Sequence, residues 1–434
     1  MNGMNGRPCG CGREHRFDSR VITGDGVLAQ LPEELRRLGG TKAFVLSDRN
    51  TFAAAGNTVL ELLKKAGIPC TSFSFPEDQP EPDERSVGAA VMHMDAACDI
   101  LVAVGSGVVN DIGKILSALS RRPYIIVATA PSMDGYASAT SSMNRSGLKT
   151  SLPSRCADTI IGDSRILCKA PMKLLRSGIG DMLAKYISIC EWRIAHLLIG
   201  EYYCEDVADL IRAAVEQCVS HADGLLNREK DAVMAVFEGL IIGGVAMNYA
   251  GISRPASGVE HYISHVLDMR AVEFGNQAEL HGIQCAMGTY LAAQLYEKLK
   301  TVTPDRQKAM ESVAAFDKEA WNGTLREMLG KGAESMIALE EKEKKYDLQS
   351  HGVRLEKILE LWPRFMEIIA QEIPKMEALE ALYRKLELPR TLADIGEDEN
   401  MLPTVLRCTK DIRDKYVLSR LAWDIGMEKE LFDK

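Results

Sequence analysis

The chain has 434 residues, of which 46% are hydrophobic and 26% are charged, as in an ordinary globular protein. This length predicts two or more domains. The net charge of −9 argues against a nucleic-acid-binding protein, which would carry a basic patch. No apolar segment typical of a signal peptide follows the first methionine, and the longest apolar stretch, residues 237–250, is interrupted by glycines. We therefore expect a cytoplasmic protein without stable membrane association and without a nucleic-acid partner.

The first half of the chain alternates short apolar strands with helices. The expected strands cover residues 42–47, 70–75, 100–104 and 124–128, and the expected helices cover residues 51–66, 86–97 and 109–120. Such alternation predicts a parallel sheet that binds its ligands beyond the carboxyl ends of the strands. From about residue 165 onward almost every window has a helical pattern. We expect an α/β dinucleotide-binding domain over residues 1–165 and an all-helical domain over residues 166–434.

Cysteines are numerous, and one short cluster stands out among them. Eleven are scattered without a regular framework, so most are expected to be small buried hydrophobic residues. Cys9, Cys11 and His15 are residue types that bind soft metals. However, they provide only three ligands, and their spacing differs from that of a zinc ribbon. A structural or incidental role is the favoured interpretation.

A glycine-rich turn connects the expected strand 100–104 to the helix that follows it. Its sequence is Gly105-Ser-Gly107-Val-Val-Asn110-Asp111. Glycines there let the backbone approach a ligand, and the amino end of the helix offers N–H groups to a pyrophosphate. Asn110 stands where the dinucleotide fingerprint has its third glycine, so an ordinary strand-to-helix turn is an equal alternative.

Two other strands end in residues suited to a cofactor crevice. Residues 129–138 crowd hydroxyl groups, a carboxylate and a glycine just after a strand, although Pro131 would also suit a rigid, capped loop. Asp48 follows the first expected strand and is placed to bind the ribose of an adenosine. An exposed aspartate in a turn is the competing explanation for Asp48.

Three of the eight histidines occur within a short span, residues 261–281. His261 and His265 are four residues apart and would share one face of a helix, and His281 follows after a polar interval. Neutral imidazole is a common ligand of divalent metals, and Asp181, which opens an apolar helical run, is the expected hard ligand. On this argument both His261 and His265 bind the metal. An isolated pair with this spacing is more often a purely structural pair.

Taken together, the motifs resemble the sn-glycerol-1-phosphate dehydrogenases, especially the bacterial branch. The resemblance covers roughly residues 8–300 and extends to the fold group of iron-containing alcohol dehydrogenases, glycerol dehydrogenases and dehydroquinate synthases. The shared motifs, in order, are the glycine turn, Thr-Ala-Pro-Ser-Met-Asp-Gly, Gly-Asp181-x-x-Ala-Lys, Glu-Trp with His196, Ser-Gly-x-Glu-His261-x-x-x-His265 and Leu-His281-Gly. This resemblance implies an α/β nucleotide-binding domain followed by a helical domain, the dehydroquinate synthase-like fold.

The resemblance also implies roles for the metal- and substrate-binding residues. Asp181, His261 and His281 match three metal ligands, with zinc or nickel as the usual ion and iron also tolerated by such a ligand set. His265 matches a substrate contact, which departs from the metal role argued from spacing; three protein ligands already complete an open catalytic site. Asp134 matches a substrate-binding carboxylate. Asp181 and His265 are the expected catalytic residues, and Asp181 is expected to touch the substrate too.

The cofactor is implied to be NAD(H) or NADP(H). Asp48 favours NAD, because its carboxylate would repel the 2′-phosphate of NADP. Lys149 is our own candidate for binding the substrate phosphate, from its position after the loop that contains Asp134. The residues that match dinucleotide-binding positions are Asp48, Gly105, Gly107, Val108, Val109, Asn110, Asp111, Thr129, Ala130, Pro131, Ser132 and Ser138.

The implied activity is reduction of dihydroxyacetone phosphate to sn-glycerol 1-phosphate by hydride transfer, with the carbonyl oxygen polarised by a divalent metal. The resemblance suggests a homodimer or larger homo-oligomer. One alternative is a dehydrogenase of the same fold acting on glycerol or another polyol. Another is a carbocycle-forming lyase of the dehydroquinate synthase kind, and a third is a non-catalytic protein, which we would expect to lack a metal ligand.

Overall fold

The computed structural model describes residues 4–77, 80–146 and 148–433, which form two compact units. The first unit comprises Met1–Met182 and Asp209–Ile252, and the second comprises Leu183–Ala208 and Ser253–Lys434. A parallel sheet in the first unit and an all-helical second unit confirm the predicted fold class. Each unit draws on two segments of the chain, and the predicted domain boundary after residue 165 stays a prediction.

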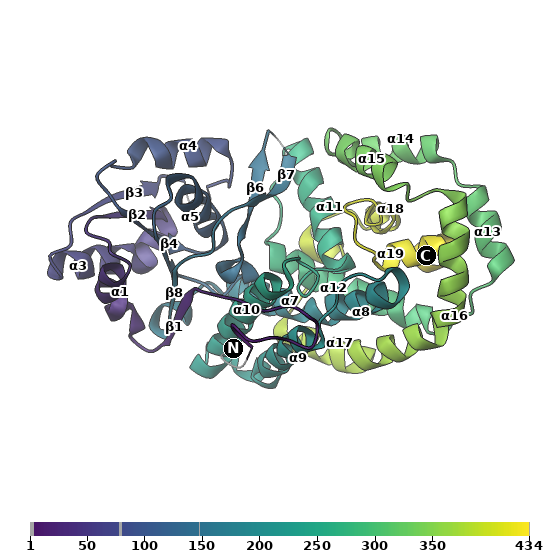
Figure 1. Cartoon of the computed structure of the whole chain (residues 1–434), viewed down its shortest axis with the longest axis horizontal. Helices are drawn as coiled ribbons and strands as arrows, with labels where there is room; N and C mark the ends of the chain where they lie inside the picture. The colour runs from purple at the N-terminus through teal and green to yellow at the C-terminus, as the bar shows by residue number, and fades with distance from the viewer. Residues whose placement is uncertain (1–3, 78–79, 147, 434) are drawn as a thin grey trace. The chain divides into compact units, whose positions relative to one another are not determined.

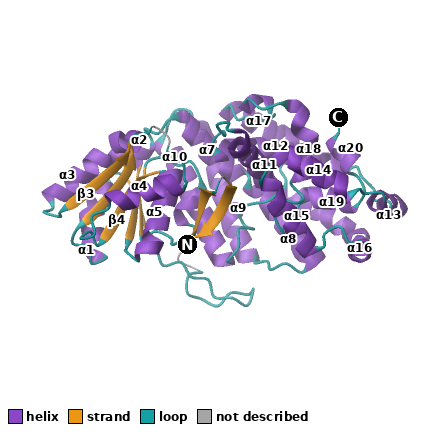
Figure 2. Cartoon of the chain, turned by 90° about the horizontal axis from the view of Figure 1, so that it is seen from above, coloured by secondary structure: helices purple, strands orange, loops and turns teal. Residues whose placement is uncertain are grey.

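The first unit is built around a six-stranded sheet with the strand order β1-β8-β5-β4-β2-β3 (Figures 1 and 2). Each pair of neighbouring strands runs parallel. All residues of β2, β4, β5 and β8 are buried, as expected for a sheet covered on both faces. The strands are β1 (Arg20–Gly24), β2 (Ala43–Asp48), β3 (Cys70–Phe75), β4 (Ile100–Gly105), β5 (Tyr124–Ala128) and β8 (Thr159–Asp163).

Helices connect these strands, and their positions largely follow the sequence prediction. The expected helix over residues 51–66 is divided into α2, a π-helical turn (Phe52–Gly56) and α3. The expected helix over residues 86–97 begins and ends earlier. The helices of this part of the chain are α1 (Leu31–Arg37), α2 (Arg49–Thr51), α3 (Asn57–Lys65), α4 (Glu84–His93), α5 (Gly107–Ser120) and α6 (Ser164–Leu167).

The connections out of β2 and β4 diverge, although the two strands are neighbours in the sheet. The chain continues from β2 to β3 at one edge and from β4 to β5 in the opposite direction. A sheet of this kind has a crevice at the carboxyl ends of the two strands, where ligands bind. Because β2 ends at Asp48 and β4 ends at Gly105, both predicted cofactor positions lie at this edge of the sheet.

The remainder of the first unit is a β-hairpin and three longer helices. The hairpin pairs β6 (Thr140–Arg145) with β7 (Leu148–Pro153) and follows the short helix η3 (Asp134–Ala137). A Cβ atom on Gly162 would lie 2.1 Å from Phe237, so α10 packs closely against β8. The three helices are α7 (Met172–Leu183), α9 (Glu205–Ser220) and α10 (Lys230–Ala250), of which α7 and α9 cross a boundary between units.

Helix α10 is long and apolar enough to cross a membrane by length and composition. Most of its apolar window, 72%, is buried inside the protein. Core helices of globular proteins pass the same test, because a helix that is hydrophobic all round can be buried in a large core.

The second unit consists of packed helices. Helix α11 contains His261 and His265, and α12 begins at His281, which brings the two ends of the predicted histidine segment together. The helices are α8 (Lys185–Ile199), α11 (Val259–Phe274), α12 (His281–Leu299), α13 (Arg306–Ala314), α14 (Lys318–Leu329), α15 (Gly332–Glu343), α16 (Leu348–Glu372), α17 (Met376–Leu386), α18 (Leu402–Cys408), α19 (Leu418–Asp424) and α20 (Glu428–Phe432).

Candidate active site

The turn between β4 and α5 is held rigid by hydroxyl groups and by close packing. Ser106 Oγ lies 2.5 Å from Ser132 Oγ, and the Tyr136 hydroxyl donates to Ser106 Oγ at 3.0 Å. A Cβ atom on Gly105 would lie 2.5 Å from the Cβ atom of Val109. The first amides of a helix have no partner within that helix, so those at the start of α5 face the end of β4 as hydrogen-bond donors. The turn therefore has the form of an anion-binding site built from the backbone.

Asn110, the departure from the glycine fingerprint, is fully buried. Its side-chain amide donates to the Gly135 carbonyl at 3.1 Å, and its Oδ1 accepts from the Tyr124 hydroxyl at 3.0 Å. Close packing of α5 on the sheet falls instead to Gly113, where a Cβ atom would lie 2.6 Å from the Tyr124 hydroxyl. Asn110 thus fastens the loop after β5 to α5, and a direct contact with a cofactor stays a prediction.

Lys114 is a buried cation that the sequence argument did not identify. Its ammonium group lies 2.7 Å from Asp111 Oδ1 and donates to the Gly135 carbonyl at 3.1 Å and to Ser138 Oγ at 3.4 Å. Two predicted cofactor residues, Asp111 and Ser138, are therefore connected through Lys114. Its position one turn after Asp111 on a helix was the available clue, since opposite charges three residues apart attract each other.

Asp48 caps the helix that follows β2. Its Oδ1 accepts from the Thr51 amide at 2.7 Å, and the Asp48 amide donates to Thr51 Oγ1 at 2.9 Å. This reciprocal pair is a capping box, which satisfies two amides at the start of a helix. The side chain is largely buried, so Asp48 is not the exposed turn aspartate of the competing explanation. Binding of a ribose stays a prediction.

Asp181 is buried in α7 and contacts the loop that contains Asp134. The Asp134 amide donates to Asp181 Oδ2 at 2.9 Å, and Ser177 Oγ donates to the Ser132 carbonyl at 2.8 Å. A Cβ atom on Gly178 would lie 1.9 Å from the Pro131 oxygen, so no larger residue fits where α7 meets this loop. The structure brings together Asp181 and the loop 129–134, which the sequence argument placed in one site from separate motifs.

Lys149 lies on β7 opposite Asn144 of β6 and is half-buried. A hairpin strand holds its backbone in place. Its contact with a phosphate stays a prediction.

The imidazoles of His261 and His281 lie side by side in the second unit. Their ring centres are 5.0 Å apart. His261 Nδ1 lies 2.8 Å from Glu260 Oε1, which also accepts from the Gly258 amide at 2.7 Å. Because Oε1 acts as an acceptor, His261 carries its proton on Nδ1, which leaves the lone pair of a neutral ring on Nε2.

Ser264 fixes the tautomer of His281 in the same way. The Ser264 hydroxyl donates to Gln284 Oε1 at 2.6 Å, so its oxygen accepts from His281 Nδ1 at 3.1 Å. The lone pair of a neutral His281 is then on Nε2. Metal-binding histidines typically donate their other ring N–H to an oxygen, which orients the ring and raises its basicity. Both histidines have this arrangement, and Glu260, Ser264 and Gln284 provide it.

A cysteine lies close to the two histidines in the structure. His261, His281 and the buried Cys285 form a group whose ligand atoms lie within 4.8 Å of one another. Cys285 Sγ lies 3.6 Å from His281 Nε2, one helical turn along α12. The sequence argument missed Cys285, although it has the same four-residue spacing that drew attention to His261 and His265. The ring of His265 is 6.3 Å from that of His281 and half-buried.

Comparison with known proteins places these features in a family. A model described as iron-containing alcohol dehydrogenase matches residues 22–171. The glycerol-1-phosphate dehydrogenase [NAD(P)+] of Halalkalibacterium halodurans is 32% identical over 294 residues, which cover 67% of this chain and 74% of that protein. The protein of the same name from Methanothrix thermoacetophila is 34% identical over 280 residues, covering 64% of this chain and 77% of the relative. This chain belongs to the glycerol-1-phosphate dehydrogenase family. The suspected resemblance is thereby confirmed.

Solved structures of other dehydrogenases have a similar fold over nearly the whole length of this chain. A glycerol dehydrogenase from Schizosaccharomyces pombe aligns with a TM-score of 0.62 at 16% identity, covering 96% of this chain and 91% of that chain. A probable glycerol dehydrogenase from Sinorhizobium meliloti aligns with a TM-score of 0.60 at 18% identity, covering 96% and 97%. At these identities the likeness concerns the fold.

Two buried carboxyl groups lie behind the histidines of this dehydrogenase family member. A Cβ atom on Gly258 would lie 2.6 Å from Glu191 Oε2 and 2.7 Å from Glu260 Oε2, so the two groups converge on one glycine. Burial, followed by the nearby charge of Glu260, raises the pKa of Glu191 to about 8. Burial also raises the pKa of Glu260 to about 7. Two adjacent buried carboxyl groups cannot easily both ionise, so near neutral pH at least one of them tends to stay protonated.

Proposed function

We propose that this chain is a metal-dependent, NAD(P)-linked glycerol-1-phosphate dehydrogenase that reduces dihydroxyacetone phosphate to sn-glycerol 1-phosphate. The relatives that carry this name support the proposal. The observation that carries it is the histidine pair in which His261 and His281 both have their Nδ1 protons engaged by oxygen atoms. This arrangement leaves two imidazole nitrogens as neutral ligands, as a catalytic metal site requires.

We propose Asp181, His261 and His281 as the ligands of a divalent ion. Two imidazoles and a carboxylate suit zinc or nickel, and iron also tolerates this ligand set. The two histidines suit such an ion, because neighbouring oxygen atoms fix their tautomers, and Asp181 is the carboxylate that the family resemblance adds to them. When bound, the ion supplies a Lewis acid for the substrate carbonyl.

The cofactor is proposed to bind in the crevice between β2 and β4. The glycine turn offers the amides of Gly107, Val108 and Val109 to a pyrophosphate, and residues Thr129, Ala130, Pro131 and Ser132 follow the next strand of the sheet. Asp48 would accept from an adenosine ribose, which favours NAD over NADP. Asn110, Asp111 and Ser138 hold the surrounding loops in position through their contacts with Gly135 and Lys114.

Substrate binding is assigned to Asp134, Asp181, His265 and Lys149. Asp134 and Asp181 would orient the hydroxyl groups of the triose. Lys149 would bind the phosphate, which gives binding energy at a position remote from the reacting carbon. His265 would exchange a proton between a ring nitrogen and the C2 oxygen, since imidazole gains and loses protons near neutral pH.

The test is consumption of NADH with dihydroxyacetone phosphate and, separately, with dihydroxyacetone. Protein stripped of metal would be assayed before and after reloading with zinc or nickel. We expect metal-dependent turnover of the phosphate compound and its loss in His281→Ala. The chirality of the product completes the test. If the product is sn-glycerol 1-phosphate, an enzyme specific for sn-glycerol 3-phosphate should not oxidise this product.

Three results would redirect the assignment. Turnover only with dihydroxyacetone would make this chain a polyol dehydrogenase of the same fold. Absence of net NADH consumption, with a cyclised product formed from a larger phosphate substrate, would favour a lyase of the dehydroquinate synthase kind. Absence of both NADH binding and metal binding would favour a non-catalytic protein.

We also propose a homodimer or larger homo-oligomer located in the cytoplasm. The family resemblance is the basis of the first statement, and the second repeats the expectation from the sequence analysis. Light scattering on the purified full chain tests the first, and fractionation of cells that express it tests the second.

A further inference from the structure

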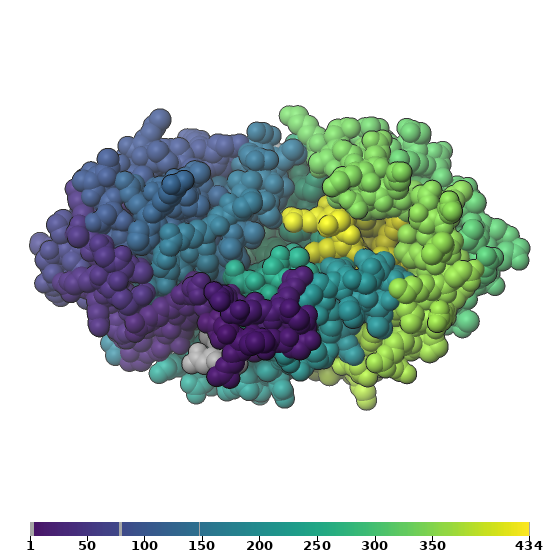
Figure 3. Space-filling model, in the orientation of Figure 1, coloured from purple at the N-terminus to yellow at the C-terminus, as the bar shows by residue number. Residues whose placement is uncertain are grey.

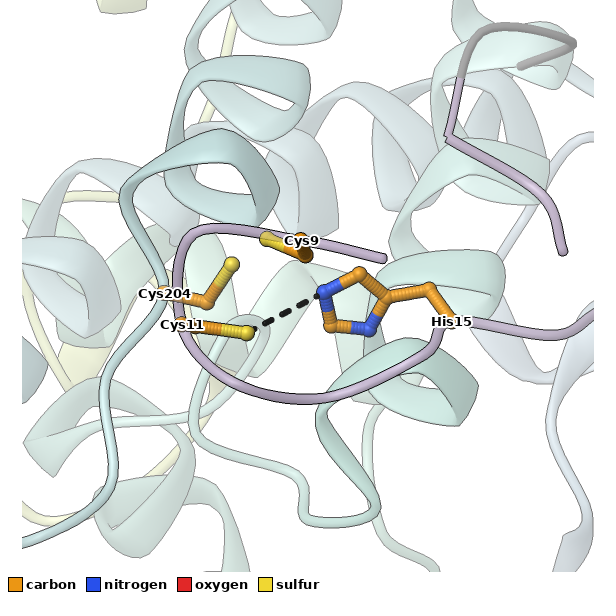
Figure 4. Close-up of side chains that lie close together, drawn as sticks. All are labelled: Cys9, Cys11, His15 and Cys204. Carbon is orange, nitrogen blue, oxygen red and sulfur yellow. Dashed lines mark hydrogen bonds between the residues drawn. The ribbon is translucent and has the colours of Figure 1, made fainter. Parts of the chain in front are cut away.

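The N-terminal segment forms a tight loop around Cys9, Cys11 and His15 (Figure 4). The Gly12 amide donates to the Cys9 carbonyl at 3.0 Å, and the Cys9 amide donates to the Arg13 carbonyl at 3.0 Å. Gly12 has a φ angle of +81°, a left-handed conformation that favours glycine. These contacts turn the chain so that both thiols and the imidazole point toward one place. The segment lies on the outside of the protein, where Figure 3 shows it in purple.

The imidazole of His15 is fully buried and fixed by a backbone oxygen. His15 Nδ1 lies 3.0 Å from the Tyr249 carbonyl at the end of α10, and its ring centre is 5.2 Å from the Tyr249 ring. A carbonyl oxygen can only accept, so the proton of a neutral His15 is on Nδ1 and the lone pair is on Nε2. Cys11 Sγ lies 3.5 Å from that Nε2 atom.

A fourth ligand comes from the start of α9. The Cys204 carbonyl accepts from the Ala208 amide at 3.0 Å, so Cys204 occupies the amino end of this helix. Helices α9 and α10 are consecutive and meet where Cys218 Sγ lies 3.3 Å from the Ala235 carbonyl. Cys204 precedes Cys218 by fourteen residues, and Tyr249 follows Ala235 by fourteen residues. Consecutive helices with a short connection run antiparallel. Equal distances along α9 and α10 from their contact at Cys218 and Ala235 therefore bring Cys204 to the same level as the Tyr249 carbonyl, which orients His15.

We propose that Cys9, Cys11, His15 and Cys204 bind a structural zinc ion. Their ligand atoms all lie within 4.8 Å of one another. Tetrahedral zinc with sulfur at about 2.3 Å and nitrogen at about 2.0 Å separates its ligand atoms by roughly 3.5–3.8 Å. The 3.5 Å between Cys11 and His15 already matches this spacing, and a small contraction brings in the others. Three thiolates and one imidazole are a ligand set typical of closed structural zinc sites.

The position of the fourth ligand explains why the spacing of the N-terminal residues alone did not predict a zinc site. The N-terminal motif provides three ligands, and the fourth lies almost two hundred residues later, at Cys204. Three thiolates would leave zinc with a net charge of −1, and the Arg13 side chain, which donates to the Ala250 carbonyl at 2.8 Å, places a cation in the same loop. The ion would fasten the N-terminal segment to α9 and α10. Four protein ligands leave no open position, so this site has no catalytic role.

Metal content of the full chain tests the proposal separately from the catalytic reaction. In a His281→Ala background, which weakens the catalytic site, we expect zinc purified with the chain under reducing conditions. The additional double substitution Cys9→Ser and Cys11→Ser should lower the zinc content by one ion per chain. Cys168→Ser, a half-buried cysteine elsewhere in the first unit, is the matched control and should leave the zinc content unchanged.

Replacement of zinc by cobalt(II) gives a second measurement. Thiolate ligands should produce a ligand-to-metal charge-transfer band that the double cysteine variant lacks and that Cys168→Ser retains. Equal zinc content with and without Cys9 and Cys11 would overturn the proposal. A disulfide among Cys9, Cys11 and Cys204 in protein that was never exposed to a chelator, found by mass spectrometry after alkylation without reductant, would overturn it as well. Neither result depends on turnover of NADH.

Discussion

The glycine turn of the first unit and the histidine pair of the second unit present ligand-binding groups in opposite ways. At the turn, the groups offered to a ligand are backbone amides, while side chains such as Asn110 and Lys114 are buried and hold the loops in position. At the histidine pair, the backbone is ordinary helix and the ligand groups are side chains. The orientation of those side chains depends on a second set of polar residues.

This difference determines which substitutions each region tolerates. A backbone site depends on the space around its glycines, so an added methyl group should damage it more than an altered polar side chain nearby. A side-chain site depends on the identity of each ligand and of the residue behind it. The departure from the glycine fingerprint at Asn110 is compatible with cofactor binding for this reason, because the turn keeps Gly105 and Gly107 while Asn110 points into the core.

The largest expected effect is that of His281→Ala. Loss of a ligand should lower turnover by more than about a hundredfold, since removal of residues behind a ligand already costs about 10- to 100-fold. NADH binding, measured by fluorescence titration, should stay within a factor of about two if the two regions act separately. His93→Ala, an exposed histidine of α4, is the control. If His281→Ala lowers NADH affinity as strongly as it lowers metal affinity, the glycine turn and the histidine pair do not act separately.

Ser264→Ala tests the second set of residues. It removes the acceptor for the His281 Nδ1 proton and leaves the imidazole in place. We expect metal affinity to fall about 10- to 100-fold, measured by competition with a chromogenic chelator. Thr289→Val is a suitable control, because Thr289 is also buried and its hydroxyl donates to the Cys285 carbonyl of its own helix, α12, at 2.8 Å. Unchanged metal affinity in Ser264→Ala would contradict the assigned tautomer.

Gly105→Ala tests the backbone site. The new methyl group would lie 2.5 Å from the Cβ atom of Val109 and would push α5 away from the end of β4. Overpacking of this kind costs about 1–3 kcal/mol, and we expect NADH affinity to fall by about tenfold or more while metal affinity is kept. Gly88→Ala in α4 is the matched control, because no atom lies within 4 Å of a Cβ atom there. Equal NADH affinity in both variants would exclude the turn as the pyrophosphate site.

Much of the fold was predictable from apolar periodicity. Strands β3 and β5 have the predicted bounds. Strand β5 is a short, fully buried apolar run typical of a parallel sheet, whereas β3 is a partly buried edge strand. Strands β1 and β8 were missed. β1 is an edge strand, partly exposed, and pairs with β8, so neither its pattern nor its partner is evident from neighbouring sequence.

For the candidate sites, the sequence argument proposed ligands but did not propose the residues that support them. His261 and His281 were predicted and lie together, but Glu260, Ser264 and Gln284 act through hydrogen bonds whose geometry depends on how α11 and α12 pack. Lys114 was missed for the same reason, and Glu191 was noted only as part of a shared motif, since the role of a buried charge depends on its surroundings rather than on its neighbours in sequence. Cys204 could not be assigned to the N-terminal cysteine cluster from the sequence, because its position there depends on how α9 packs against α10.

The smallest expected effect concerns the two carboxyl groups behind the histidines. Burial and the neighbouring Glu260 raise the pKa of Glu191 from its ordinary value of 4.5 to about 8. Between these values the folded chain keeps a proton that the unfolded chain has lost, so the free energy of unfolding falls as pH rises through this range. Each such proton contributes a slope of at most about 1.4 kcal/mol per pH unit. The stabilising contribution is complete below pH 4.5 and is lost by about pH 8.

Glu191→Gln replaces this group with a neutral one of the same shape. The free energy of unfolding should then fall less steeply between pH 5 and pH 8, by the slope that one bound proton contributes. Urea unfolding of the metal-free chain at several pH values measures it, because bound metal would add a pH dependence of its own. The control Glu356→Gln, an exposed residue of α16, should keep the slope of the unaltered chain. If Glu191→Gln also keeps that slope, Glu191 is ionised at neutral pH and the charge behind the histidines is larger than proposed. The Glu260 carboxyl group that orients His261 would then lie beside a second negative charge.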